Sequence, residues 1–204
     1  MEAERPVLFT IGHSTHEWVE FVALLQKHGV TAVADVRSQP SSRLPQYVKA
    51  ELQAGLKKAG IDYVFLGREL GARRDEPQCY DDGQAVYERI ADLLAFREGL
   101  DRTVRGLQKH RIALMCAEKE PLDCHRTVLI CRHLRDHQFP IRHILADGSL
   151  EDHEATERRL LRITNTERTL FEPDLTEEEL LNQAYETRGR EIAYRNREPI
   201  GASQ

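Results

Sequence analysis

Five short apolar runs, separated by longer segments with helical spacing, constrain the fold of this 204-residue chain. Each run is too short for a helix and is bounded by polar or turn residues, which is typical of a buried strand. Strands that alternate with helices form a mainly parallel sheet with helices on both faces. The sequence therefore predicts an α/β fold with a Rossmann-like three-layer arrangement. The expected strands are residues 7–11, 31–36, 61–66, 112–115 and 141–145.

Capping signals indicate where the helices begin. Ser14 and Glu17 have the spacing of a capping box ahead of the first helix, and Thr176 and Glu179 have the same spacing near the C-terminus. Further helices are expected over residues 50–59 and 86–110, the second with a break near Gly99 or Gly106.

The chain becomes heavily charged after residue 150. We expect an α/β core domain over residues 1–150 and a C-terminal helical extension over 151–195 that packs on the core. Residues 196–204 are expected to form a disordered tail.

Composition narrows the class of protein. A hydrophobic fraction of 40% and a charged fraction of 31% are those of a globular domain, and no apolar run approaches a membrane span. The acidic N-terminus lacks the features of a secretion signal, and four cysteines suit a reducing compartment. We therefore expect a cytoplasmic protein without a membrane partner. The net charge of −5 argues against a broad basic surface for nucleic acid and is compatible with a local basic cleft.

The segment 111–126 is the first candidate for the functional site. Cys116 and Glu118 follow its apolar run, and Asp123 is the expected N-cap of a helix that continues to about residue 137. The first turn of such a helix favours an anion, and Arg126 adds a forked donor suited to phosphate or carboxylate. Because open α/β sheets bind ligands at the carboxyl ends of their strands, we expect the site here.

Polar residues also follow the first two expected strands. His13 stands at the end of the first, where it either contacts a ligand or makes a structural hydrogen bond. Asp35 and Arg37 point to the same face, so they either pair with each other or present both charges to a substrate. The expected substrate-binding residues are Ser14, Arg37, Arg43, Arg73, Arg74, Cys124, His125 and Arg126.

Two catalytic chemistries are compatible with these residues. Cys116 is a candidate nucleophile, because helix N-termini and arginines lower the pKa of a thiol; the alternative is a buried core residue. In the second chemistry Glu118 or Asp35 is a general base, and His13 or His125 is the acid. The sequence leaves both chemistries open.

Metal binding through Cys116, Cys124 and His125, with His13 as a further candidate ligand, is a third hypothesis. Cysteines eight residues apart, without paired Cys-x-x-Cys elements, do not match a structural zinc module. The adjacent side chains of Cys124 and His125 are also expected to point in different directions from a helical turn. We therefore assign no metal ligands, and the sequence indicates no particular cofactor.

Four short motifs occur together at the expected strand ends and loops. They are residues 10–14 (Thr-Ile-Gly-His-Ser), 35–43 (Asp-Val-Arg-Ser-Gln-Pro-Ser-Ser-Arg), 67–71 (Gly-Arg-Glu-Leu-Gly) and 116–126 (Cys-Ala-Glu-Lys-Glu-Pro-Leu-Asp-Cys-His-Arg). With these motifs the chain resembles the domain-of-unknown-function 488 family over most of residues 7–147. Residues 184–194 are similar to the family's C-terminal end. The resemblance implies a compact α/β fold with the motifs gathered at one edge of the sheet, and it implies no reaction.

Together these observations predict an anion-binding site at the carboxyl edge of the sheet. We expect an enzyme, a hydrolase or a transferase, that acts on a phosphorylated, nucleotide or nucleic-acid-derived substrate. The catalytic candidates are Cys116, Glu118, His13 and Asp35. The alternatives are a non-catalytic module that binds a nucleotide or a nucleic-acid end, and a Cys/His metal-binding protein. The expected partner is an anionic small molecule or a nucleic-acid end, and the sequence does not indicate an oligomeric state.

Overall fold

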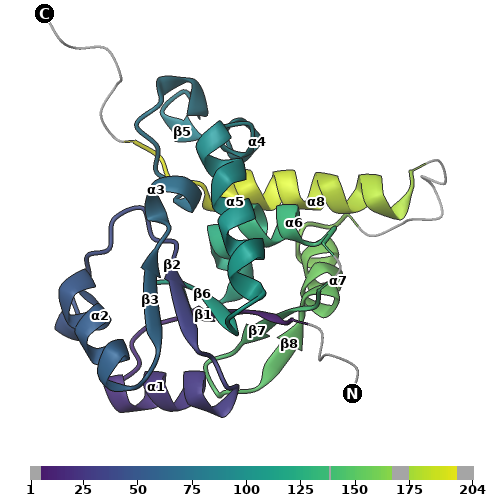
Figure 1. Ribbon diagram of the computed structural model, residues 1–204. Coiled ribbons are helices and arrows are strands. Elements are labelled where there is room, and N and C mark those ends of the chain that lie inside the picture. The colour runs from purple at the N-terminus through teal and green to yellow at the C-terminus, as the bar shows by residue number, and fades with distance from the viewer. Residues whose placement is uncertain (1–5, 138, 167–174, 197–204) are drawn as a thin grey trace, which may run out of the picture.

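A computed structural model describes residues 6–137, 139–166 and 175–196, and its centre is a six-stranded sheet (Figure 1). The strand order is β3-β2-β6-β1-β7-β8; β7 and β8 are antiparallel, and the other neighbours are parallel. All five expected strands are confirmed to within one residue at each end. The strands are β1 (Leu8–Gly12), β2 (Ala32–Asp35), β3 (Asp62–Phe65), β6 (Ile112–Cys116), β7 (Ile141–Ile144) and β8 (Leu150–Asp152).

Helices cover both faces of the sheet, which confirms the predicted α/β class (Figure 1). α1 and α2 pack on one face, where Phe9 shares a buried cluster with Phe21 of α1 and Leu52 of α2. α5, α6, α7 and α8 pack on the other face, against Leu8 and Leu114. Neighbouring strand residues face opposite layers because successive side chains alternate across a strand. These helices are α1 (Trp18–Lys27), α2 (Lys49–Lys58), α5 (Leu94–Leu107), α6 (Arg132–Leu134), α7 (His153–Ile163) and α8 (Glu177–Ile192), and two shorter ones, α3 (Gly67–Leu70) and α4 (Tyr87–Ala91), come before α5 in the chain.

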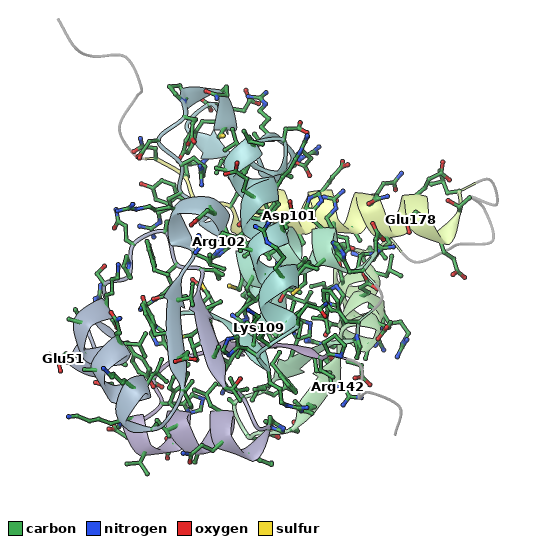
Figure 2. The ribbon with its side chains drawn as sticks, in the orientation of Figure 1. Glu51, Asp101, Arg102, Lys109, Arg142 and Glu178 are labelled. Atoms are coloured by element: carbon green, nitrogen blue, oxygen red, sulfur yellow. The ribbon has the colours of Figure 1, made fainter. Side chains whose placement is uncertain are left out.

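Several charged side chains on α2, α5 and α8 face outward. Glu51 on α2, Arg102 on α5 and Glu178 on α8 are exposed and point away from the sheet (Figure 2). In the part of the chain that the structure describes, no helix combines the length and the apolar character needed to cross a membrane.

The prediction of a capping box at Ser14 is wrong. Ser14 lies in a turn with a positive φ of 47°, and the N-cap of α1 is Glu17, which forms a capping box with Glu20. The cause is long-range: the backbone N–H groups of His13 and Ser14 donate to carbonyls of residues 116 and 117, at 2.9 Å each. The chain therefore remains hydrogen-bonded to the residues at the end of β6 after β1 has ended, and α1 begins only at Trp18.

Two other predicted helix features are also wrong. Asp123 lies in a 3₁₀ turn (Pro121–Asp123) and pairs with Arg188, while the helix proper starts with a π-helical segment (Arg126–Cys131). The helix expected over 86–110 is divided at residues 92–93 into α4 (Tyr87–Ala91) and α5, rather than at a glycine. Gly99 instead allows α5 to lie close to Leu70, which a Cβ would overlap.

The structure contains elements that the sequence patterns did not predict. β8 runs across the expected domain boundary at residue 150, and α7 follows it. β4 (Tyr80–Asp81) and β5 (Gln84–Ala85) form a short hairpin. The segment after α8 pairs with this hairpin, since the Ala85 N–H donates to the Tyr194 carbonyl at 2.9 Å. The domain boundary stays a prediction, and the expected tail lies, from residue 197 on, outside the described residues.

Thr176→Ala is expected to lower the free energy of unfolding by about 1 kcal/mol. The predicted capping box is confirmed: Thr176 Oγ1 accepts the Glu179 N–H at 3.2 Å, and the Glu179 carboxylate accepts the Thr176 N–H at 2.8 Å. Urea denaturation measures the loss. Glu177→Ala is the control, because it removes a first-turn carboxylate and leaves the box intact. Equal losses in the two variants would show that the cap contributes nothing of its own.

Candidate functional site

The carboxyl ends of three adjacent strands meet at one edge of the sheet. In the order β2-β6-β1, Asp35 ends β2, Cys116 ends β6, and His13 follows β1. Parallel strands end at the same edge, so the residues that follow them gather where open α/β sheets bind ligands. Glu118 lies in the loop after Cys116, so all four predicted catalytic residues come from this edge.

Asp35 and Arg37 form a buried ion pair. The Asp35 side chain is fully buried, and that of Arg37 is 5% exposed. Arg37 Nε donates to Asp35 Oδ1 at 2.8 Å and Nη2 donates to Oδ2 at 2.6 Å, in the bidentate geometry of a strong pair. The Tyr63 hydroxyl also donates to Oδ2, at 2.9 Å. Of the two alternatives that the sequence leaves open, the structure shows the internal pair.

His13 packs against the same arginine. Its ring stacks on Tyr47 with centroids 4.1 Å apart, Nδ1 donates to the Ser14 carbonyl at 3.0 Å, and Nε2 faces Arg37 Nη1 at 3.4 Å. Burial and the nearby charge of Arg37 lower the pKa of His13 to about 4. The imidazole is therefore neutral at neutral pH and accepts a hydrogen bond from the arginine.

Cys116, Cys124 and His125 converge on one point and form what we call the Cys/His cluster. The two sulfur atoms and Nδ1 of His125 lie within 4.8 Å of one another, and all three residues are buried. Nδ1 is 3.7 Å from Cys116 Sγ and 3.8 Å from Cys124 Sγ. Nε2 donates to the Val36 carbonyl at 3.1 Å, which directs the lone pair of a neutral ring toward the sulfurs. Cys124 Sγ is also hydrogen-bonded to Glu118 Oε2, at 3.0 Å.

The backbone at Cys124 explains the convergence. Cys124 is extended, with φ −135° and ψ 138°, whereas His125 is helical, with φ −59° and ψ −24°. The prediction that the two side chains point apart assumed that both residues lie in one helical turn. That prediction is wrong because the helical backbone begins only at His125.

The two thiols of the cluster differ in acidity. The hydrogen bond with Cys124, together with burial, raises the pKa of Cys116 well above its ordinary value. Burial alone would raise the pKa of Cys124 as well, but the hydrogen bond with Cys116 and the charge of Arg126 lower it well below its ordinary value. Burial raises the pKa of Glu118. Cys124 is therefore the more acidic of the two thiols, and its proton is the one that the thiol donates to the Glu118 carboxylate.

Arg126 holds the loop that carries the cluster. Its side chain is fully buried; Nη1 donates to the Glu118 carbonyl at 2.7 Å, and Nη2 donates to the Lys119 carbonyl at 3.2 Å. Its backbone N–H donates to Cys124 Sγ at 3.4 Å. Gly12 lies against the same loop, because a Cβ there would overlap the Glu118 carbonyl oxygen. The observed partners of the Arg126 guanidinium are thus backbone carbonyls, and its contact with a substrate stays a prediction.

A cavity of about 290 Å³ opens in front of the cluster. Cys116, Glu118 and His125 line it, so these side chains can be reached by a ligand. Arg73 lines another part, with its guanidinium carbon over the Tyr194 ring, 4.5 Å from the centroid. The other lining residues are Arg37, Ser38, Gln39, Ser41, Ala72, Tyr87, Ala117, Asp123, Ile192 and Tyr194 itself.

The remaining predicted binding residues are not part of this lining. Arg74 pairs with Glu76 at 2.7 Å, Arg43 is exposed, and Ser14 lies in the turn after β1. Arg73 is exposed and lines the cavity, so it is the predicted arginine best placed to meet an anion there.

Sequence reasoning missed the C-terminal wall of the cavity. Ile192 ends α8, and Tyr194 reaches the cavity because the following segment pairs with the β4–β5 hairpin. A local signal for this contact is weak, since the hairpin lies about a hundred residues earlier in the chain. The similarity of residues 184–194 to a family's C-terminal end is the sequence feature that could have indicated it.

Comparison with known proteins gives a family but no reaction. A family model described as "Domain of unknown function DUF488" matches residues 17–132. The matched range contains the motifs at 35–43, 67–71 and 116–126, whereas the motif at 10–14 and α8 lie outside it. No curated protein and no solved structure matches the chain.

Proposed function

Because the chain belongs to the family described as Domain of unknown function DUF488, and that description names no reaction, we propose a function from the site itself. The protein is an enzyme that hydrolyses a phosphorylated, nucleotide or nucleic-acid-derived substrate. One observation carries this proposal: Cys116, Glu118 and His125 lie together at the carboxyl edge of the sheet and also line the cavity. Ionisable groups with shifted pKa values that gather in a cleft are typical of catalytic sites.

Glu118 is the general base in this proposal. It lines the cavity, its Oε2 accepts a hydrogen bond from the Cys124 thiol at 3.0 Å, and Arg126 fixes its backbone carbonyl. Burial raises its pKa above the ordinary value, which brings the carboxylate closer to the pKa at which base catalysis is most efficient near neutral pH.

The cavity walls support the choice of substrate. Arg73 supplies a forked cationic donor for phosphate, and Ser38, Gln39 and Ser41 add neutral polar groups. Tyr87 and Tyr194 add aromatic surface, which suits a nucleobase. A phosphorylated ligand with an aromatic part would use both kinds of wall.

Covalent catalysis by Cys116 is the second candidate. Cys116 lines the cavity and lies 3.7 Å from His125 Nδ1, the geometry of a thiol beside a base. It ranks second because Cys124 ionises before Cys116, and only the thiolate is a strong nucleophile. Covalent catalysis needs a reduced thiol, and the four cysteines are free, so we place the reaction in the cytoplasm.

The substrate class is tested by thermal unfolding with nucleoside mono- and diphosphates, sugar phosphates and short DNA or RNA ends. A ligand at 100 times its Kd stabilises the folded state by about 2.7 kcal/mol, so binding raises the Tm measurably. We expect a shift in the wild type that is largely lost in Arg73→Ala and kept in Arg105→Ala. Arg105 is an exposed arginine of α5 that does not line the cavity. Equal shifts in all three proteins would contradict the proposed binding site.

Catalysis is tested next, with the ligand that gives the shift. Glu118→Gln is expected to keep the shift and to lose about 10²- to 10⁴-fold in turnover, the usual contribution of a general base. Cys116→Ser reports on the second candidate, because a covalent route loses its nucleophile. Tight binding with no turnover by the wild type would make the protein a binding module instead.

A further inference from the structure

We propose that Cys116, Cys124 and His125 bind a zinc ion, with a fourth coordination position that opens into the cavity. The inference adds a cofactor to the enzyme proposed above, and its test needs no substrate. Two thiolates and an imidazole form a ligand set that zinc prefers, and two thiolates balance the charge of the ion.

The distances in the cluster suit a tetrahedral ion. Zinc–sulfur bonds are about 2.3 Å and zinc–nitrogen bonds about 2.0–2.1 Å, so ligand atoms around one ion lie roughly 3.5–3.8 Å apart. The Nδ1 atom of His125 is 3.7 Å from Cys116 Sγ and 3.8 Å from Cys124 Sγ. Little movement is needed to place an ion among the three atoms.

The surroundings of the ligands are also those of a metal site. A metal-bound histidine usually donates its other ring N–H to a carbonyl or carboxylate, and His125 Nε2 donates to the Val36 carbonyl. The Arg126 N–H donates to Cys124 Sγ at 3.4 Å, a contact that stabilises a thiolate. The buried Arg126 guanidinium also fixes the loop between the two cysteines.

Cys131 shows how a core cysteine of this chain differs. It is as buried as the cluster cysteines and lies in the same apolar core, yet it is outside the group of converging ligand atoms. Cys116 and Cys124 instead both face the Nδ1 atom of His125, at 3.7 and 3.8 Å. Packing alone does not require that arrangement.

The open position gives the ion a catalytic use. Zinc with three protein ligands and one exchangeable position is the pattern of catalytic sites, and Cys116 and His125 line the cavity. A water in that position would lose a proton to Glu118, whose Oε2 is 3.0 Å from Cys124 Sγ. The water oxygen would then bond to the electrophilic atom of the substrate, and Glu118 would pass the proton to the departing group as its bond breaks.

The test is a cobalt titration of the chelator-treated, reduced protein, followed by absorption spectroscopy. We expect the visible bands of tetrahedral Co²⁺ and a near-ultraviolet sulfur-to-cobalt band, which saturate at one ion per chain and disappear when zinc is added. Cys116→Ala and Cys124→Ala are each expected to weaken binding by more than about 100-fold, because loss of a ligand exceeds the usual effect of its supporting residues. Cys131→Ala and Glu118→Gln are expected to keep the bands.

A second measurement uses the wild type alone and does not depend on the folding of a variant. Zinc is expected to protect Cys116 and Cys124 from alkylation, as mapped by mass spectrometry. The inference would be overturned if the titration of the wild type gave only the spectrum of aqueous Co²⁺. It would also be overturned if both thiols were alkylated as fast with zinc as in the metal-free protein. In that case an anion-induced Tm shift that depends on Arg73 would still support the proposed enzyme, now without a metal.

Discussion

Replacement of Arg37 by alanine is expected to lower the free energy of unfolding by about 3–5 kcal/mol. The substitution leaves the Asp35 carboxylate, which is fully buried, without the two hydrogen bonds from the guanidinium. Among the described residues, only Tyr63 and the residue 37 N–H remain as donors to it. An uncompensated buried charge is far more costly than a missing surface contact, so the effect should be large. Urea denaturation at neutral pH measures it.

Two further variants separate this explanation from a general loss of packing. Arg97→Ala removes a pair whose side chains are 63% and 81% exposed, and it is expected to cost at most about 1 kcal/mol. Arg37→Met combined with Asp35→Leu removes both charges, and it should be less destabilising than Arg37→Ala alone. A double variant at least as unstable as Arg37→Ala would contradict the buried charge as the cause.

The ion pair also supports the site. Asp35 and Arg37 flank Val36, whose carbonyl accepts the Nε2 proton of His125. Loss of the ion pair is therefore expected to loosen the Val36 carbonyl, which sets the tautomer of His125 in the Cys/His cluster. Arg37→Ala should lower the affinity of the cluster for Co²⁺ even at temperatures where the variant is folded.

Local sequence signals were sufficient for the strands and insufficient for the helix ends. An apolar run such as 112–115 marks a buried strand wherever its partners lie, so β6 could be predicted from its own residues. The start of α1 depends instead on hydrogen bonds between His13, Ser14 and the end of β6, about a hundred residues away. Spacing of Ser14 and Glu17 contains no information on those bonds.

The candidate site also combines features that local sequence predicts with features that depend on distant contacts. The edge at which Cys116, Glu118 and Asp35 lie follows from the parallel sheet alone. The convergence of Cys124 and His125 depends on one extended residue at the end of a 3₁₀ turn, which their spacing does not indicate. The contribution of Tyr194 depends on a hairpin at residues 80–85. Sequence therefore located the site, and tertiary contacts decided its composition.

Acidification from about pH 7 to about pH 5 is expected to destabilise the protein through a buried histidine pair. Thr10 Oγ1 is 2.8 Å from His143 Nδ1, and His143 Nε2 is 3.0 Å from His153 Nδ1. His153 Nε2 is 3.1 Å from the Tyr185 hydroxyl, which donates to Glu157 at 2.9 Å. When both imidazoles carry their proton on Nε2, every donor in this series of hydrogen bonds meets an acceptor. A proton added to His153 Nδ1 would face the Nε2–H of His143, so two donors would oppose each other.

The direction of the effect follows from the pKa values. Burial, and after it the charge of Arg135, lowers the pKa of His153 from 6.5 to about 4. Burial and the neighbouring His153 lower the pKa of His143 as well. The unfolded chain binds protons as the pH falls through 6.5, and the folded chain does not do so until about pH 4, so stability is lost in this window. His153 alone accounts for about 2 kcal/mol between pH 7 and pH 5, and His143 adds loss in the same direction.

The comparison of pH dependence between variants isolates this pair from the other titrating groups. His13 destabilises in the same window, since its pKa is also lowered to about 4, whereas the raised pKa of Glu157 opposes the loss. Both contributions are present in His153→Gln, so the fall in unfolding free energy from pH 7 to pH 5 should be smaller in this variant by about 2 kcal/mol. His137→Gln, at an exposed position, should show the fall of the wild type. Parallel pH dependence in the wild type and in His153→Gln would mean that the pair accepts a proton without loss of packing.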